Sequence, residues 1–507
     1  MSEKPRIRIK ASVGDFKNTV EPAYHGASQS RRIVGYGTNG SGPNAVLSGS
    51  IETLRNRSRH ADRNSPLIKK ANNANVTNEV GTGFVTRFRS SNDEFNEAMR
   101  LAHDIWAKQC CPDGSLGFYG LQSLIARARR IAGDCFVRRR NRPTSVGLYI
   151  PMQVQVLEAE FVPHWLNETR RNGNKIKQGI EFNKYGERVA YWMHKEHPVD
   201  GEAYFDPFNL IRVSAKDVIH TYKPSRPGQI RGEPESSSSL LKVKTFEQYD
   251  DFELQRKEAR AGYTGMLTRQ EYDDRDYAYD PFTGKPLYEE DGTLELGMVP
   301  GTIMTGLPGE KLELFDGDNT GSGYKDYQRE QKLMIAAGVD TPYELITGDW
   351  SGVNDRIYRA FINEYRRGIA ATQDHLMVFQ VLRVITDWFI QAAILSGRVK
   401  APGYIKDKDD YHKAEHRPHA WKYVHPEQDV KAKILEIEAG LNSSDAIVAE
   451  SGFDGEEIDR QNAIAKARRK ELDEEYGLTN QTEESEEDPP QESDPSEEDE
   501  LEEPEPA

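Results

Sequence analysis

The side chains of this sequence best suited to chemistry are two histidines and a glutamate. His412, Glu415 and His416 match the inverted zinc-protease pattern, in which two ligands one turn apart share a helix face. The surrounding segment is polar throughout and is cut by Pro418, so no apolar face would hold such a helix against a core. The sequence therefore predicts a solvated charged connector here and no metal site.

Two further motifs match a chemical pattern only in part. Gly35, Gly37 and Gly40 have dinucleotide-binding spacing, but the short charged segment before them is not the buried strand that this site needs. The segment from Asp316 begins like a calcium loop, yet its twelfth position is Tyr327 instead of a bidentate glutamate. Phosphate-binding and serine-nucleophile motifs are missing as well. We expect no catalytic residue and no cofactor.

Charge is distributed unevenly along the 507 residues, whose net charge is −16. Residues 1–150 hold 24 basic and 12 acidic side chains, whereas residues 482–507 hold 14 acidic and no basic ones. Dense arginines could bind phosphate backbones, or they could pair with carboxylates across subunit contacts. We favour pairing slightly, because the middle of the chain is acidic. The two arginine groups are Arg55, Arg57, Arg59 and Arg63, and then Arg127, Arg129, Arg130, Arg138, Arg139, Arg140 and Arg142.

Hydrophobic periodicity predicts the elements that would position these side chains. Helical spacing is followed by alternating, strand-like segments, with a hairpin at residues 184–186. A glycine- and proline-rich β module then lies between two helices, and a long helix and several short ones complete the chain. The predicted helices cover 94–109, 116–132, 239–267, 321–338, 355–397 and parts of 426–477, and the antiparallel β region covers 135–222.

The three cysteines and the longest apolar stretch suggest a reduced, soluble protein. Cys110, Cys111 and Cys135 form no CxxC pair, so no disulfide framework is expected. Residues 376–395 include Arg383 and Asp387, which predicts a soluble helix with one wet face and no membrane span. The N-terminal residues lack the apolar core of a secretory signal.

Seven stretches, in family order over residues 45–478, resemble the portal proteins of tailed bacteriophages, lambda-type. They include LRNRSRHADRNSPLIKKANNANVTNEVGTG, MVPGTIMTGLPGEKLELFD and IAAGVDTPYELITGDWSGVNDRIYRA. The most distinctive one is VIHTYKPSRPGQIRGEP. Its signature residues are Arg226, Pro227, Gly228, Gln229, Arg231 and Gly232.

The resemblance implies an α+β portal fold and a ring of twelve copies. In that fold a mixed α/β wing carries a two-helix stem with a small α/β clip at its tip, and a tunnel loop precedes a long helix and a helical crown. The implied regions are a flexible basic arm (1–45), wing (46–238), stem helix 1 (239–268), clip (269–320), stem helix 2 (321–338), tunnel loop (339–354), long helix with connector (355–424), crown (425–478) and disordered acidic tail (479–507).

It also implies a non-enzymatic function at the portal vertex of the virion, after assembly in the host bacterial cytoplasm. Double-stranded DNA would pass through the channel without sequence recognition. The expected protein partners are the terminase large subunit, head-completion or adaptor proteins and the major capsid protein, with no membrane partner. The alternatives are a nucleic-acid-processing enzyme that uses the basic N-terminal third, and a ring-forming virion adaptor without a clip.

Two groups of residues are candidates to face the channel. On stem helix 2, Lys325, Arg329 and Lys332 lie on one helical stripe; they could form rings of charge toward DNA, or pair with the acidic helix 247–258 of a neighbour. The acidic tail could repel DNA or mimic it. The expected tunnel-loop residues are Asp349, Trp350, Ser351, Gly352, Val353, Asn354, Asp355 and Arg356.

Overall fold

The computed structural model describes residues 37, 40–198, 209–262, 266–268, 304–306, 323–419, 421, 426–450 and 455–476. The expected basic arm up to residue 36, most of the expected clip and the acidic tail lie outside the described residues. The start of the glycine motif at Gly35 and the calcium-like segment from Asp316 lie outside them too.

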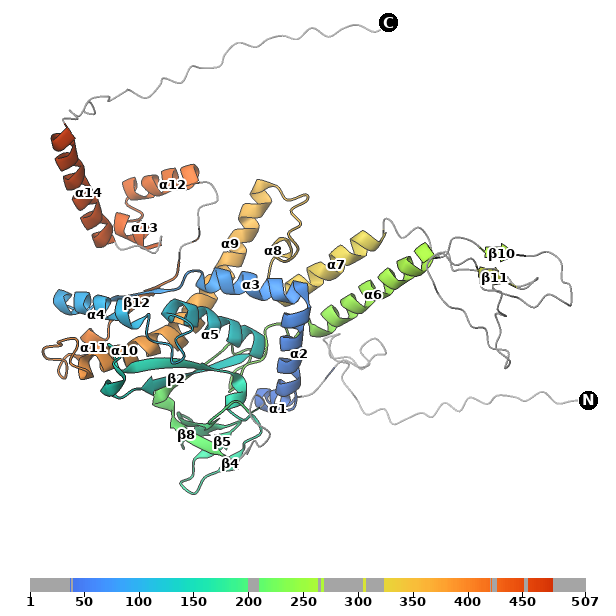
Figure 1. Ribbon diagram of the computed structural model, residues 1–507, viewed down its shortest axis with the longest axis horizontal. Coiled ribbons are helices and arrows are strands. Elements are labelled where there is room, and N and C mark those ends of the chain that lie inside the picture. Colours follow the sequence, from blue (N-terminus) through green and yellow to red (C-terminus); the bar gives the residue numbers. More distant parts are fainter. Residues whose placement is uncertain are drawn as a thin grey trace, which may run out of the picture.

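Helices from the first third of the chain form one side of the body (Figure 1). In α4, the side chain of Asn92 caps the helix by accepting a hydrogen bond from the Phe95 amide. Phe95, Met99 and Trp106 recur at helical spacing on its buried face. The helices are α1 (Pro43–Ser48), α2 (Ile51–Asn64), α3 (Pro66–Val80), α4 (Asp93–Trp106) and α5 (Phe118–Ala132).

Two antiparallel sheets follow α5. The three-stranded sheet has the order β3-β2-β9, and the five-stranded sheet has the order β4-β5-β6-β7-β8. The expected hairpin is present: Gly186, at φ 83°, lies in the turn between β6 and β7. The strands are β2 (Asp134–Asn141), β3 (Met152–Leu157), β4 (Glu168–Thr169), β5 (Lys175–Lys177), β6 (Ile180–Phe182), β7 (Arg188–His194), β8 (Leu210–Ser214) and β9 (Val218–Tyr222), with short 3-10 turns at Thr144–Val146, Ala159–Phe161 and Ala215–Asp217.

A pair of helices, α6 (Leu240–Gly262) and α7 (Gly323–Gly338), runs side by side away from the body (Figure 1). Val243, Phe246 and Ile335 join them to the body in one apolar cluster. The first helix ends at Gly262, earlier than predicted, and residues 266–268 are strand β10 (Met266–Thr268). This strand pairs in parallel with β11 (Met304–Gly306), and the rest of the predicted β module lies outside the described residues.

The longest helix is continuous from Asp355 to Leu395. It consists of α9 (Asp355–Thr372), a π-helical segment η6 (Gln373–Leu382) and α10 (Arg383–Leu395). Met377, Val381 and Phe389 are buried in the largest apolar cluster, together with α4 and α5. The helix therefore connects the body's core to an exposed end beyond it (Figure 1).

The connector after the longest helix differs from the prediction. Residues predicted as a solvated connector form α11 (Lys408–Tyr411) and strand β12 (Ala414–Arg417), which pairs with β1 (Val85–Phe88). The strand was missed because its four residues are polar and its partner is some 330 residues away in the sequence. The chain then forms α12 (Pro426–Glu438), α13 (Ser444–Glu450) and α14 (Gly455–Tyr476).

Candidate functional site

A short exposed loop, residues 348–354, precedes the longest helix. Asp349 orders it, because its Oδ1 accepts hydrogen bonds from the Ser351 amide (3.1 Å) and hydroxyl (2.6 Å). These bonds from Ser351 lower the pKa of Asp349. Gly348 and Gly352 have φ of 72° and 77°, a conformation that favours glycine. The loop is thus built by local hydrogen bonds and presents its remaining side chains outward.

The end of the predicted tunnel-loop segment is helical. The Asn354 side chain accepts a hydrogen bond from the Ile357 amide (2.9 Å) and so caps α9. Asp355 and Arg356 therefore belong to the first helical turn and not to the loop.

The beginning of the expected 339–354 loop is also not loop. Tyr343–Thr347 is helix α8, and Val339, Tyr343 and Ile346 are buried beside α7. Only residues 348–354 have the exposed, irregular backbone that a projecting loop requires.

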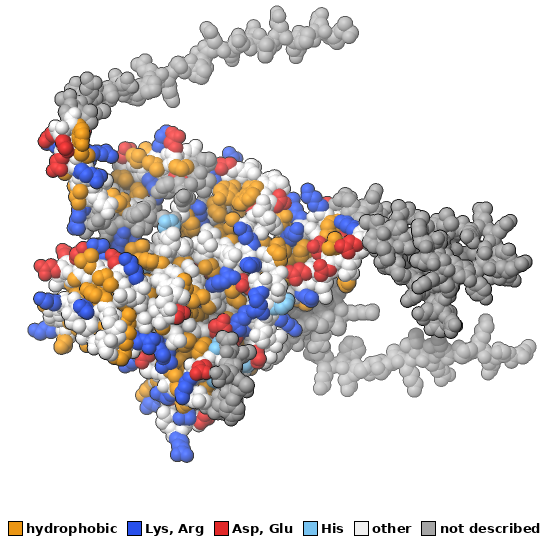
Figure 2. All heavy atoms as spheres, in the orientation of Figure 1, with side chains coloured by type: hydrophobic (Ala, Val, Ile, Leu, Met, Phe, Trp, Pro, Cys, Tyr) orange, Lys and Arg blue, Asp and Glu red, His pale blue; other side chains and the backbone are white. Residues whose placement is uncertain are grey.

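Large apolar side chains are exposed at this end of α9. Trp350 is 46% exposed and makes an edge contact with Tyr358, with ring centroids 5.6 Å apart. Ile357 and Phe361, on the first turns of α9, are each about half exposed. Figure 2 shows apolar side chains gathered at this end of the helix. Such a patch is typical of a contact with another molecule.

The three cations predicted to share a stripe on α7 have different surroundings. Lys325 and Arg329 are exposed, and the Arg329 guanidinium lies 5.9 Å from the ring centre of Tyr343. Lys332 is partly buried, and its Nζ lies 5.8 Å from the ring centre of Phe246 on α6. Lys332 therefore packs toward its own chain.

The acidic helix that could have paired with this stripe also contacts its own chain. The Asp250 carboxylate on α6 accepts hydrogen bonds from Gln328 (2.7 Å) and from the Tyr324 hydroxyl. Glu253 is buried and pairs with Arg256 at 2.9 Å. Part of the acid on α6 is thus used within the subunit.

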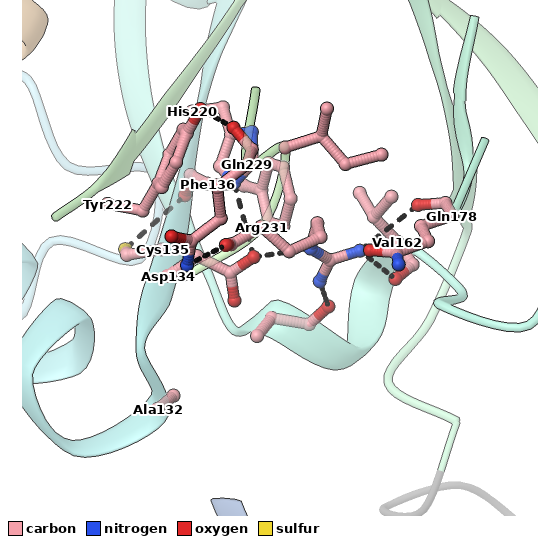
Figure 3. Close-up of polar contacts among 12 residues, drawn as sticks. Ala132, Asp134, Cys135, Phe136, Val162, Gln178, His220, Tyr222, Gln229 and Arg231 are labelled. Atoms are coloured by element: carbon pink, nitrogen blue, oxygen red, sulfur yellow. Dashed lines mark hydrogen bonds and ion pairs between the residues drawn. The ribbon is translucent and has the colours of Figure 1, made fainter. Parts of the chain in front are cut away.

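Two of the signature residues, Gln229 and Arg231, lie in a buried polar cluster (Figure 3). The Arg231 Nε pairs with Asp134, and its two Nη atoms donate to three backbone carbonyls at 3.0 to 3.2 Å. Asp134 also pairs with Arg55 (2.7 Å) and contacts His220 (3.2 Å). The carbonyls belong to Ala159, Val162 and Gln178. Arg231 thereby joins β2 to the segments flanking the five-stranded sheet.

Burial and charge act against each other in this cluster. Burial alone would raise the pKa of Asp134, but the guanidinium groups of Arg231 and Arg55 lower it well below its usual range. Burial lowers the pKa of His220 to about 4, although hydrogen bonding to Asp134 acts in the opposite direction. The carboxylate is therefore ionised and His220 neutral at pH 7.

The rest of the signature closes a tight turn. The Gln229 amide donates to the Arg231 carbonyl (2.8 Å), and its Oε1 accepts from the Ser225 and Arg226 amides. A Cβ on Gly232 would overlap the Gly133 carbonyl oxygen, so only glycine allows this approach. Gly228 has φ of 78° but open space around it. Gln229 and Gly232 therefore hold the backbone of this turn in place.

Comparison with known sequences identifies the family. The sequence model described as phage portal protein, lambda family, matches residues 29–373, which include both the signature and the exposed loop. The chain belongs to the lambda family of phage portal proteins. This family is structural, in agreement with the expectation that the chain is not an enzyme.

Individual portal proteins show the same relationship at low identity. The probable portal protein of Halomonas phage phiHAP-1 is 24% identical over 425 residues, covering 81% of this chain and 79% of that protein. Portal protein B of Escherichia phage lambda is 21% identical over 317 residues, covering 57% of each chain.

Solved structures show a more distant likeness. A chain of the native gene transfer agent virion has a TM-score of 0.41 at 12% identity, covering 80% of this chain and 93% of that chain. A chain from the neck of the native particle, computed with C12 symmetry, has a TM-score of 0.41 at 13% identity.

Six of the eleven arginines in the two groups pair with carboxylates of the same chain, whereas the sequence favoured pairs across subunit contacts. The Arg129–Glu79 pair is fully buried. The other pairs are Arg55–Asp134, Arg59–Glu160, Arg127–Asp62, Arg130–Glu235 and Arg139–Asp217.

The metal-like motif is used for packing. His412 contacts Asp387 and Tyr404 through its two ring nitrogens, both at 2.8 Å. His416 lies on strand β12, so the two histidines do not share a helix face. Burial lowers the pKa of His416 to about 4. This segment is therefore a structured part of the body.

Two features were not found by sequence reasoning. Glu158, Glu160 and His197 bring their ligand atoms within 4.8 Å of one another, but Arg59 already pairs with both carboxylates. The Asp134 cluster joins residues 77 to 97 positions apart, and no local pattern announces such contacts.

Among the described residues, one helix, Asp355–Leu395, is long and apolar enough to cross a bilayer by length and composition alone. The burial of Met377, Val381 and Phe389 in the body's core explains much of this apolar character.

Proposed function

We propose that copies of this portal protein close into a dodecameric ring at one capsid vertex, and that double-stranded DNA passes through its centre during packaging and ejection. The family match supports this proposal, since portal proteins form the head–tail connector. The closed ring would cover apolar side chains that one subunit leaves exposed, such as Trp350 and Phe361.

The observation that carries the channel proposal is the exposed loop 348–354 at the free end of the longest helix. Local hydrogen bonds from Ser351 to Asp349 hold it in shape. It offers one aromatic side chain, Trp350, and no lysine or arginine. A channel must hold DNA without trapping it, and a wall poor in basic side chains avoids strong binding through counterion release. We assign this loop to the tunnel.

We assign the other regions from the resemblance to the portal family. Residues 46–238 form the wing and contact the major capsid protein, whereas α6 and α7 form the stem. The clip between them, largely outside the described residues, binds the terminase large subunit and later head-completion proteins. Residues 425–478 form the crown. Assembly takes place in the host bacterial cytoplasm, and the finished ring is part of the virion.

Negative-stain microscopy of the purified protein, combined with packaging by complementation, tests the proposal. We expect holed rings for the wild type, and rings with reduced packaging for Trp350→Ala. The matched control is Trp165→Ala, because Trp165 is 43% exposed but lies in the β region. Compact single subunits in the images would refute the ring, and normal packaging by Trp350→Ala would refute the role of the loop.

The acidic tail, outside the described residues, has a separate test. We propose that its 14 acidic residues keep DNA from binding at the crown, by repulsion or by mimicry. Deleting residues 482–507 should change packaging while leaving rings intact. Unchanged packaging would reject both forms of this proposal.

A further inference from the structure

Strand β2 continues beyond the buried core into a row of arginines. Alternate residues of a strand project to the same face, so Phe136, Arg138 and Arg140 share one face of the three-stranded sheet. Phe136 is fully buried between the two sheets. Arg138, Arg140 and Arg142, farther along, are partly exposed. The row thus begins where the second sheet stops covering the first.

On the opposite face of the same strand, Arg139 is paired with a carboxylate. Arg139 donates from Nε to Asp217 (2.9 Å), and its guanidinium lies 5.6 Å from the ring centre of Trp388. Within the part of the chain that the structure describes, no carboxylate forms an ion pair with Arg138, Arg140 or Arg142. One face of β2 thus carries a paired arginine, whereas the other carries arginines without a described ion pair.

The side chains opposite this row on β3 are neutral. Gln155 lies opposite Arg138 on β3, and Gln153 lies opposite Arg140. The Gln153 Oε1 accepts a hydrogen bond from the Arg142 Nε (2.8 Å) and so helps to orient that guanidinium. The face therefore presents hydrogen-bond donors and positive charge, which suits an anionic acceptor.

The row is electrostatically costly as it stands. Burial lowers the pKa of Arg138, and the next cause is repulsion by Arg140, with Asp217 acting against both. Same-face positions on a strand are about 6.8 Å apart, so three cations occupy about 14 Å without a counter-charge of their own. An external anion extended along the strand would remove this repulsion.

We infer that Arg138, Arg140 and Arg142 bind the sugar–phosphate backbone of duplex DNA, independently of base sequence, at a place separate from the loop 348–354. Guanidinium groups match phosphate oxygens in a two-pronged geometry. Figure 1 shows β2 in the body, away from the free end of α9. The inference rests on the proposed function in one respect, namely that this function brings duplex DNA to the protein.

The test measures binding of a short fluorescent duplex to full-length assembled protein at several salt concentrations. The variant Arg138→Gln/Arg140→Gln/Arg142→Gln should bind about 10- to 100-fold more weakly at low salt. Each lost phosphate contact also lowers the slope of log affinity against log salt by about 0.9, so the slope should fall by about 2 to 3.

A matched control removes three other positive charges. Arg100 and Arg367 are exposed and Arg170 is partly exposed, and all three already pair with carboxylates of their own chain, so their change to Gln should leave the slope unchanged. A second variant, with Lys at positions 138, 140 and 142, should keep most of the slope and show that the sheet still folds. An equal loss in the control, or an unchanged slope in the Gln variant, would overturn the inference.

The competing partner is an acidic protein surface. If the Gln variant binds duplex normally but loses association with capsid protein, the row serves that protein and the DNA inference is wrong. Ring formation, followed by microscopy in the same samples, reports on the proposed function separately. Rings with unaltered duplex binding would refute only the inference, whereas wild-type protein without rings would refute the function.

Discussion

The cluster around Asp134 and the exposed end of α9 differ in where their interactions are completed. Around Asp134, buried charges find partners within the chain: Arg55, Arg231 and His220 all contact this carboxylate. At the end of α9, Trp350 and Phe361 remain about half exposed. The first region is paired within one subunit, whereas the second leaves apolar side chains exposed.

This difference separates residues that build the subunit from residues available to other molecules. Isolated buried charges are costly unless paired, so the signature arginine is needed before any assembly begins. Apolar exposure costs less in one subunit and becomes favourable when a partner covers it. α12 belongs to the second kind, since none of its described side chains is buried although Val430, Ile434 and Ile437 lie on it.

Among these changes, removing Arg231 should lower the free energy of unfolding the most. Arg231→Met leaves Asp134 with one guanidinium fewer and removes a donor from three carbonyls. We expect a loss of about 3–5 kcal/mol in the free energy of unfolding. Arg226→Met, in the same signature but exposed, should cost less than about 1 kcal/mol. Chemical denaturation measures both; similar losses would contradict the central position of Arg231.

Acid should destabilise the apolar core through the buried side chain of His103. His103 lies among the rings of Phe88, Trp106, Phe118 and Phe389, and burial lowers its pKa to about 4. The unfolded chain, with an ordinary histidine pKa, binds the proton first, so stability is lost as pH falls from about 6.5 toward 4. At pH 4.5 this one group should cost about 2–3 kcal/mol.

Unfolding measured from pH 7 to 4.5, in the wild type and in His103→Leu, checks this value. The variant should lose part of the pH dependence whatever its stability at pH 7. An identical pH profile in both proteins would contradict the assignment to His103.

Two glycines of the signature allow a finer test. Ala at Gly232 would overlap the Gly133 carbonyl, whereas Ala at Gly228 has open space and suffers only from its positive φ. We expect Gly232→Ala to lower the free energy of unfolding by about 1–3 kcal/mol and Gly228→Ala by about 1 kcal/mol. A larger loss for Gly228→Ala in thermal or chemical unfolding would reverse our account of the turn.

The smallest effect on stability is expected in the exposed region. Trp350→Ala removes one ring contact, with Tyr358, and no described hydrogen bond. Its free energy of unfolding should change by less than about 0.5 kcal/mol, even though packaging is impaired. A loss comparable to that of Arg231→Met would place Trp350 among the residues that build the subunit.

The sequence predicted local structure better than long-range contacts. Periodicity placed α4, α5, α7 and the long helix within a few residues, because helix caps and apolar spacing are local signals. It missed the β1–β12 pair, whose partners are hundreds of residues apart, and it treated α8 as loop.

Candidate site residues were harder to place, because side-chain pairing depends on the tertiary fold. Arginine spacing suggested a basic surface, yet Arg55 and Arg129 are buried with carboxylates from distant elements. The resemblance singled out the signature, but only the structure showed that Arg231 and Gln229 bond to distant or neighbouring backbone groups. Lys332 matched a helical stripe, and only the structure showed that its Nζ lies 5.8 Å from the ring centre of Phe246 in the same chain.

The solution mass of the purified protein, by sedimentation or native mass spectrometry, tests the central claim that the subunit is completed by copies of itself. The account predicts a closed assembly near twelve times the chain's 57.5 kDa. A mass equal to one chain under all conditions would contradict it.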